Sequence, residues 1–305
     1  MAAHAPGMEL ILAAQGGDAD TVKRVLEGTP GIDANEADEE GRTALGIASE
    51  EGHTAVVRAL LAAPGVDVNK VQGLGETPLL WASLRGHAEV VQVLLAAPGV
   101  DVNKAAHDGC TPLLGASIAG RAEVVRALLA ASRIDVTKAD ANGRTPMSAA
   151  RDHAKFHGQA IMGMLREAEE RVRLRAHAET KRKLELATEE GEEVDEVVRL
   201  LATPGVDINE ANKRGETYLF LASCSGRANV VRALLAAPGI DPNKAQMYGE
   251  TPLYSASSRG HTEVVQVLLA APGIDVNKAT DLGGTPLHWA RNDAIKDLLL
   301  AAGAR

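Results

Sequence analysis

A phrase of the form Gly-x-Thr-Pro-Leu recurs along this chain at a nearly constant interval. Its glycine stands 34 residues after the previous one at every recurrence but one, at Gly41, Gly75, Gly109, Gly143, Gly215, Gly249 and Gly283. A constant period of this length predicts a stack of small, similar units, because one such unit cannot bury its own apolar face and must pack on its neighbours. The one irregular interval, from Gly143 to Gly215, is 72 residues long, four more than two repeats.

The composition favours helices that pack through small side chains. Hydrophobic residues make up 45% of the 305 residues but aromatic residues only 2%, so Ala, Leu and Val must fill the interior. The two cysteines, Cys110 and Cys224, give no disulfide framework. The net charge of −9 argues against nucleic-acid binding, and no apolar run reaches the roughly 20 residues that a membrane helix needs.

The N-terminal residues 1–17 lack the basic region of a signal peptide, and their short apolar stretch contains Glu9. Together with the cysteine usage, this leads us to expect a cytoplasmic protein that contacts no membrane. A nuclear location stays open as an alternative.

The repeat that follows Gly75 has the pattern of two helices joined by a turn. Thr77-Pro78 predicts a helix start, because Thr is a good N-cap and Pro is tolerated in the first helical position. Gly86 is placed to end this helix in a left-handed conformation. Valines and leucines at helical spacing predict a second helix over 88–97, and a Pro-Gly pair stops it.

These features resemble the ankyrin repeat. The phrases Thr-Pro-Leu-x-x-Ala, Gly-His-x-Glu-Val-Val-x-x-Leu-Leu and Asp-Val-Asn are most complete at 77–103 and 251–277. The family repeat has 33 residues, and the extra residue here lies in the loop after the second helix. The resemblance implies an all-α ankyrin-repeat solenoid of helix-turn-helix units with projecting β-hairpin loops. The histidine of the family's Thr-Pro-Leu-His phrase stands only at His288.

The irregular interval predicts a long helical segment that joins two arrays. From Met164 to Glu190 the chain contains no Gly or Pro and is rich in Ala, Leu, Glu and Arg, all strong helix formers. One continuous helix is favoured, and a pair of helices that bend is the alternative. Residues 184–201, which include the end of this run, resemble the start of the chain and, like a first repeat, lack the Thr-Pro-Leu phrase.

We therefore predict three parts along the chain. Residues 8–175 form a first array of about five repeats with a helical end. Residues 176–183 form a helical junction. Residues 184–305 form a second array of about four repeats with a shortened C-terminal cap.

The sequence predicts a protein that is not an enzyme and has no cofactor. It contains no Walker phosphate loop and no His-Glu-x-x-His, Cys-x-x-Cys or Gly-x-Ser-x-Gly motif. His153 and His157 are spaced to share one helix face, but no carboxylate or thiol is placed to complete a metal site. A metal-binding or enzymatic protein that uses this pair is therefore the weakest alternative. We interpret His107 and Cys110, which share a hairpin, as contact surface.

The resemblance implies that a partner binds the concave surface made by hairpin tips and first helices. Transferred to this sequence, that surface is acidic and then apolar in the first array, and basic, apolar and aromatic in the second. We expect Leu84 and Ile118 to be exposed, whereas Leu80, Leu114, Phe220 and Tyr254 have exposure and packing between first helices as open alternatives. The candidate partner-binding residues are Glu39, Glu40, Glu50, Glu51, Leu74, Leu84, Arg85, His107, Ile118, Lys213, Arg214, Met247, Tyr248 and Arg259.

The function that follows is a non-catalytic scaffold or adaptor, monomeric on its own, that binds a protein or peptide. The alternative is a structural subunit permanently embedded in a larger complex, which would use the outer helices and the segment 166–183. We interpret the asparagines after Asp-x as turn-stabilising side chains. Hydroxylation, found at this position in some ankyrin proteins, is the other possibility for Asn69, Asn103, Asn209, Asn243 and Asn277.

Overall fold

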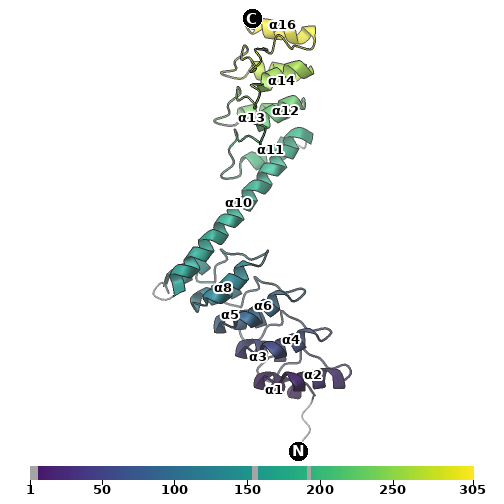
Figure 1. The fold of residues 1–305 in the computed structure, drawn as a ribbon, viewed down its shortest axis with the longest axis vertical. Coiled ribbons are helices and arrows are strands. Elements are labelled where there is room, and N and C mark those ends of the chain that lie inside the picture. Colours follow the sequence, from purple (N-terminus) through teal and green to yellow (C-terminus); the bar gives the residue numbers. More distant parts are fainter. Residues whose placement is uncertain (1–5, 153–156, 191–193) are drawn as a thin grey trace, which may run out of the picture. The chain divides into compact units, whose positions relative to one another are not determined.

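The computed structural model describes residues 6–152, 157–190 and 194–305, which contain sixteen helices (Figure 1). Over these residues the only β structure consists of three isolated bridges at the bases of hairpins, such as Gln72 with Glu76. The described chain is therefore an all-α repeat solenoid, as the resemblance to the ankyrin repeat implied. Internal contacts divide it into two compact units, Met1–Val172 and Arg173–Arg305.

The helices of the first unit pack in two rows. The first helix of each repeat contacts the next first helix, and α2, α4, α6 and α8 contact one another in the same way. The first row contains α1 (Pro6–Gly16), α3 (Ala44–Glu51), α5 (Pro78–Arg85), α7 (Pro112–Ile118) and α9 (Pro146–Asp152). The second row contains α2 (Ala19–Gly28), α4 (Thr54–Leu61), α6 (Ala88–Leu95) and α8 (Ala122–Leu129).

The second unit repeats this arrangement with an incomplete last repeat. Its helices are α11 (Val194–Leu201), α12 (Tyr218–Cys224), α13 (Ala228–Ala236), α14 (Pro252–Arg259), α15 (Thr262–Leu269) and α16 (Asp293–Ala301). The first helices α12 and α14 pack together, and α11, α13, α15 and α16 form the other row. Residues 286–289 form turns where a first helix would stand, and α16 packs on α15.

The predicted capping residues define the first helices. The Thr77 Oγ1 accepts a hydrogen bond from the Leu80 backbone N–H at 3.1 Å, and Thr43, Thr111, Thr217 and Thr251 cap their helices in the same way. Gly86 ends α5 with a φ of 90°, a left-handed conformation that favours glycine. The short helices are thus delimited by the same residues that mark the sequence period.

A single helix, α10 (Gln159–Glu190), contributes to the cores of both units. Of the two geometries that the sequence left open, the structure has the continuous helix. Ile161 and Leu165 belong to the core of the first unit, and Leu184 and Ala187 belong to the separate core of the second. Residues 170–176 are exposed. The irregular interval therefore holds the last second helix of one stack and the opening first helix of another.

Candidate protein-interaction surface

Successive hairpin tips within each unit are joined by backbone hydrogen bonds. In the first unit the His107 N–H donates to the Leu74 carbonyl at 2.9 Å, and the Ala141 N–H donates to the Asp108 carbonyl at 2.8 Å. In the second unit the Met247 N–H donates to the Arg214 carbonyl at 3.0 Å, and the Asp281 N–H donates to the Tyr248 carbonyl at 3.1 Å. Because these tips are tied to one another, their side chains form a row along each unit.

The period-marking glycine makes this close approach of the tips possible. A Cβ at Gly109 would lie 2.9 Å from the Asp140 Cα, and a Cβ at Gly215 would lie 2.9 Å from the Met247 backbone nitrogen. Both glycines also have positive φ, 85° and 77°. The glycine is therefore needed twice, for the backbone conformation of its own hairpin and for contact with the next one.

The acidic end of the first unit is partly neutralised by its own arginines. Glu50 forms an ion pair with Arg85, whose guanidinium carbon lies 5.6 Å from the centre of the Trp81 ring. Glu40 lies 3.0 Å from the Arg42 guanidinium. Glu39 and Glu51 are exposed, so these two carboxylates are the ones most accessible to a basic partner.

The apolar part of the first unit divides into a projecting residue and a packed cluster. Leu74 is exposed at its tip, as is His107 at the next one. Leu80 and Leu114 are buried, and Leu84 and Ile118 pack half-buried against them with Cys110 and Ala149. Leu84 and Ile118 are therefore less exposed than the sequence led us to expect. A Cβ at Gly115 would lie 3.1 Å from Leu84 Cδ2, so the missing side chain at 115 makes the space that Leu84 occupies.

The pair His107 and Cys110 lacks the electrostatics of a nucleophile and a base. Cys110 is buried, and this burial, with the nearby Asp108 carboxylate, raises the pKa of its thiol to about 11. The thiol is therefore protonated at neutral pH, whereas a nucleophilic cysteine needs a lowered pKa. Of this pair only His107 is exposed, so the predicted contact surface at this hairpin is reduced to His107.

The candidate residues of the second unit are more exposed to solvent than those of the first. Lys213, Arg214, Met247 and Tyr248 are exposed at successive tips, and Arg259 is exposed at the end of α14. Phe220 is buried, which excludes the exposed alternative for this residue, and Tyr254 is half-buried. Burial of Tyr254 and the nearby Glu250 carboxylate raise the pKa of its phenol.

Sequence reasoning missed two exposed residues of the second unit, Leu282 and Trp289. Leu282 is 99% exposed and stands 34 residues after Tyr248, at the equivalent tip position. Its place in the period was the signal that could have identified it. Trp289 is exposed because residues 286–289 form turns instead of a helix, which the repeat pattern does not indicate.

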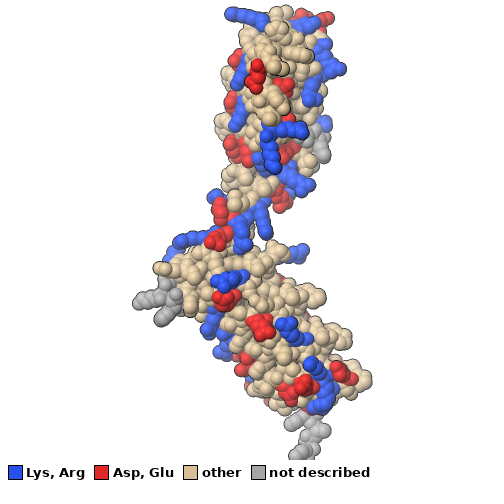
Figure 2. Space-filling model, viewed as in Figure 1, with Lys and Arg blue, Asp and Glu red and all other residues tan. Residues whose placement is uncertain are grey.

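The described residues contain neither a metal site nor a membrane-spanning helix. His153 lies outside the described residues, and His157 is exposed just before α10. Among the residues with defined placement, no three His, Cys, Asp or Glu side chains are grouped to hold a metal ion. None of the described helices is both long enough and apolar enough to cross a bilayer. Acidic and basic side chains are interspersed on the visible face of each unit (Figure 2).

Comparison with known families identifies the repeat over most of the chain. A family model described as "Ankyrin repeats (3 copies)" matches residues 10–106, 184–246 and 239–305, and one described as "Ankyrin repeat" matches residues 108–141. The unmatched interior, 142–183, contains α9 and most of α10. No curated protein matches the chain.

Proposed function

The chain belongs to the ankyrin-repeat family, whose repeats are generally protein–protein interaction modules, and on this premise we propose that it is a non-catalytic scaffold. It binds a protein or peptide through its row of hairpin tips and the adjacent ends of its first helices. The second unit provides the main apolar contact, and the exposed acids of the first unit select a partner with basic residues.

One observation carries this proposal: neighbouring tips of the second unit hold large apolar side chains in solvent. Met247 is 56%, Tyr248 63% and Leu282 99% exposed. The hydrogen bond from the Asp281 N–H to the Tyr248 carbonyl places the last two on adjacent hairpins. We call Met247, Tyr248 and Leu282 the tip row.

The tip row has the chemistry of a binding hot spot. Large apolar and aromatic side chains supply most of the energy of protein interfaces, and exposed charges around them steer association. Lys213 and Arg214 stand at the preceding tip and Arg259 at the end of α14, and all three are exposed. A partner segment with apolar residues flanked by acids is therefore the best complement to this unit.

The test replaces the tip row in the full chain by M247S, Y248S and L282S together. We expect quantitative affinity capture from cells to lose the specific partners of the wild-type chain, at least about tenfold, because loss of these three hot-spot side chains costs a few kcal/mol. The thermal unfolding midpoint should stay within a few degrees of wild type, since none of the three side chains is buried.

The matched control is V198S with L300S. Val198 and Leu300 are 50% and 55% exposed in the same unit but lie on the outer helices α11 and α16. These changes should leave capture unaltered. If partners survive the tip-row change, or are lost equally with the control, the tip row is not the binding surface.

A further inference from the structure

In most of the loops that follow a second helix, a side-chain amide from the preceding repeat holds the backbone. In the second unit the Asn209 Nδ2 donates to the Gly239 carbonyl at 2.7 Å, and the Asn209 Oδ1 accepts from the Asp241 N–H at 2.8 Å. Asn243 binds the loop after α15 in the same way. Each of these loops thus presents a carbonyl and, two residues later, an N–H that together match one carboxamide group.

The first loop of the second unit has this backbone pair but no asparagine to bind it. Gly205 and Asp207 are the equivalents of Gly239 and Asp241. Neither the Gly205 carbonyl nor the Asp207 N–H has a hydrogen-bond partner among the described residues, and both residues are exposed. Asn209 stands 30 residues before Gly239, whereas the residue 30 positions before Gly205 is Arg175, in the middle of α10. We call the Gly205 carbonyl and the Asp207 N–H the open pair.

The helix α10 lies on the side of this loop that a preceding repeat occupies elsewhere. In the next repeat a lysine reaches back to the preceding loop, since the Lys244 Nζ donates to the Asn209 carbonyl at 2.9 Å. Glu210 is the equivalent of Lys244 and pairs with Lys181 of α10 instead, at 2.6 Å. α10 therefore replaces the lysine contact of a preceding repeat, but it leaves the asparagine contact unmade.

A groove of about 610 Å³ remains between α10 and this loop. Leu174, Ala176 and Thr180 line its α10 side, and residues 203–206 line its loop side. Leu174 is 55% exposed. The groove thus combines apolar surface on the helix with the Gly205 end of the open pair on the loop.

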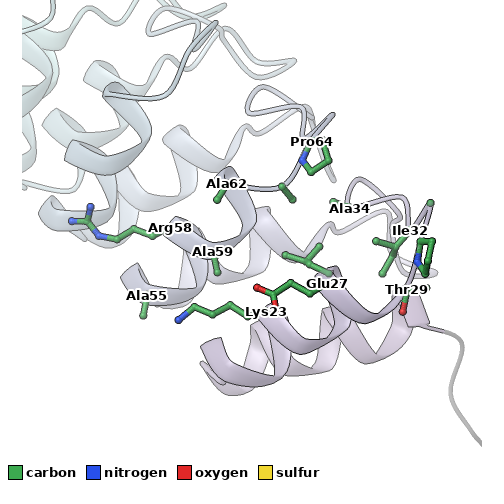
Figure 3. Close-up of a pocket in the computed structure, with 14 residues that line it drawn as sticks. Lys23, Glu27, Thr29, Ile32, Ala34, Ala55, Arg58, Ala59, Ala62 and Pro64 are labelled. Carbon is green, nitrogen blue, oxygen red and sulfur yellow. The ribbon is translucent and has the colours of Figure 1, made fainter.

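The first unit has the corresponding groups next to a different groove. The Gly31 carbonyl and the Asp33 N–H also have no hydrogen-bond partner within the described ranges. Thr29 and Ile32 of that loop line a groove with Ala59 of α4 (Figure 3). Because α4 belongs to the following repeat, that groove is not on the side from which an asparagine reaches the backbone pair.

We propose that the groove beside α10 binds the side-chain amide of an asparagine or glutamine in a partner protein. The amide nitrogen donates to the Gly205 carbonyl and the amide oxygen accepts from the Asp207 N–H, as the Asn209 amide does in the next loop. An apolar side chain of the partner, next to its amide residue, covers Leu174. This site lies outside the tip row, so the two surfaces bind independently.

A second copy of this chain does not offer its loop asparagines to the open pair. Each of them already donates to a carbonyl of its own chain, and these residues are Asn35, Asn69, Asn103, Asn209, Asn243 and Asn277. The occupant is therefore a segment of a different protein.

The test selects a displayed library of random short peptides on the full-length wild-type chain, after depletion on the variant L174E. This change puts a charge into the groove, and its thermal unfolding should match that of wild type because Leu174 is exposed. V172E is the matched control, since Val172 is 49% exposed on the same helix but does not line the groove. We expect the selected peptides to share an Asn or Gln beside an apolar residue.

In fluorescence anisotropy these peptides should bind L174E at least about tenfold more weakly than wild type, and should bind V172E and the tip-row variant as tightly as wild type. Changing the peptide's Asn to Asp, or its Gln to Glu, keeps the shape but removes the donor, and should also weaken binding at least about tenfold. The NMR signal of the Asp207 backbone amide should shift when peptide is added.

Three results would each overturn the proposal. They are a depleted library that yields no peptide, an Asp207 amide signal that does not respond, and selected peptides that keep their affinity when Asn or Gln is replaced by Ala. The last result would mean that the backbone of an extended peptide, and not a side-chain amide, binds the open pair. None of these results bears on the tip row, which is tested by its own variant.

Discussion

At the scale of single residues, an asparagine in most repeats ties its loop to the next one. The Asn69 Nδ2 donates to the Gly99 carbonyl and its Oδ1 accepts from the Asp101 N–H, both at 2.8 Å. The same pair of bonds, to a carbonyl 30 residues on and an N–H 32 residues on, recurs at Asn35, Asn103, Asn209 and Asn243. The asparagine side chain therefore joins repeats. The turn that the sequence assigned to it is stabilised instead by the preceding aspartate, since the Asp67 carboxylate accepts a hydrogen bond from the Asn69 backbone N–H at 2.9 Å.

Replacing this amide should loosen two repeats at once. We expect N69A to lower the free energy of unfolding by about 1–2 kcal/mol, the worth of two hydrogen bonds near the surface, as measured by urea denaturation. T137A is the matched control, because Thr137 stands at the equivalent position but bonds only to Asp135 of its own loop. Equal losses for the two variants would contradict a role between repeats.

A second residue-scale prediction concerns acid. The Asp140 carboxylate accepts hydrogen bonds from the backbone and side chain of Arg144 and from the Asn142 N–H, which hold its pKa below the usual value. A pKa lowered by folding stabilises the fold above the unfolded value of about 3.9, and this stabilisation disappears as pH falls through the folded value. D140N should therefore be less stable than wild type at pH 7, with the difference shrinking below about pH 4. A difference independent of pH would refute this role.

At the scale of elements, α10 carries buried leucines of two separate cores. Leu165 and Leu184 are both completely buried, the first in the core of one unit and the second in the core of the other. Their substitution by alanine leaves a similar cavity in each unit. Two matched substitutions in one helix can therefore test whether the two cores unfold independently.

We expect L165A and L184A each to cost about 2–5 kcal/mol, but in different parts of the chain. Hydrogen exchange of the full-length protein should show lost protection in α6 and α8 for L165A, and in α12 and α13 for L184A. If either change lowers protection in both units to the same extent, the cores are not independent.

At the scale of the whole molecule, each unit is a one-dimensional stack whose ends have fewer neighbours than its middle. Stability in such a stack depends on the interfaces with adjacent repeats. The last repeat of the second unit has turns at residues 286–289 in place of a first helix, and α16 stands at the end of the outer row, against α15. Amide exchange should therefore be faster in α16 than in α13, which packs between α11 and α15. Equal protection of α13 and α16 would contradict this gradient.

Much of the fold was predictable because it depends on local sequence motifs that occur again in each repeat. The threonine caps, the left-handed glycines and the breaker-free run of α10 act within a few residues of themselves. The candidate surface was less predictable. Leu84 and Ile118 have the same apolar chemistry as Leu74, yet they are half-buried whereas Leu74 projects into solvent.

The sequence by itself therefore determined the family, the all-α stack and the position of the irregular interval. The repeat period and the helix caps could be recognised because each depends only on the order of residues along the chain. Only the tertiary structure decided which apolar side chains stay exposed, because the side chains that bury the surface of one repeat belong to the next repeat. Gly115 of α7, for example, makes the space that Leu84 of α5 occupies. The shared period defines the stack, and the contacts between unlike repeats define the surfaces it offers to partners.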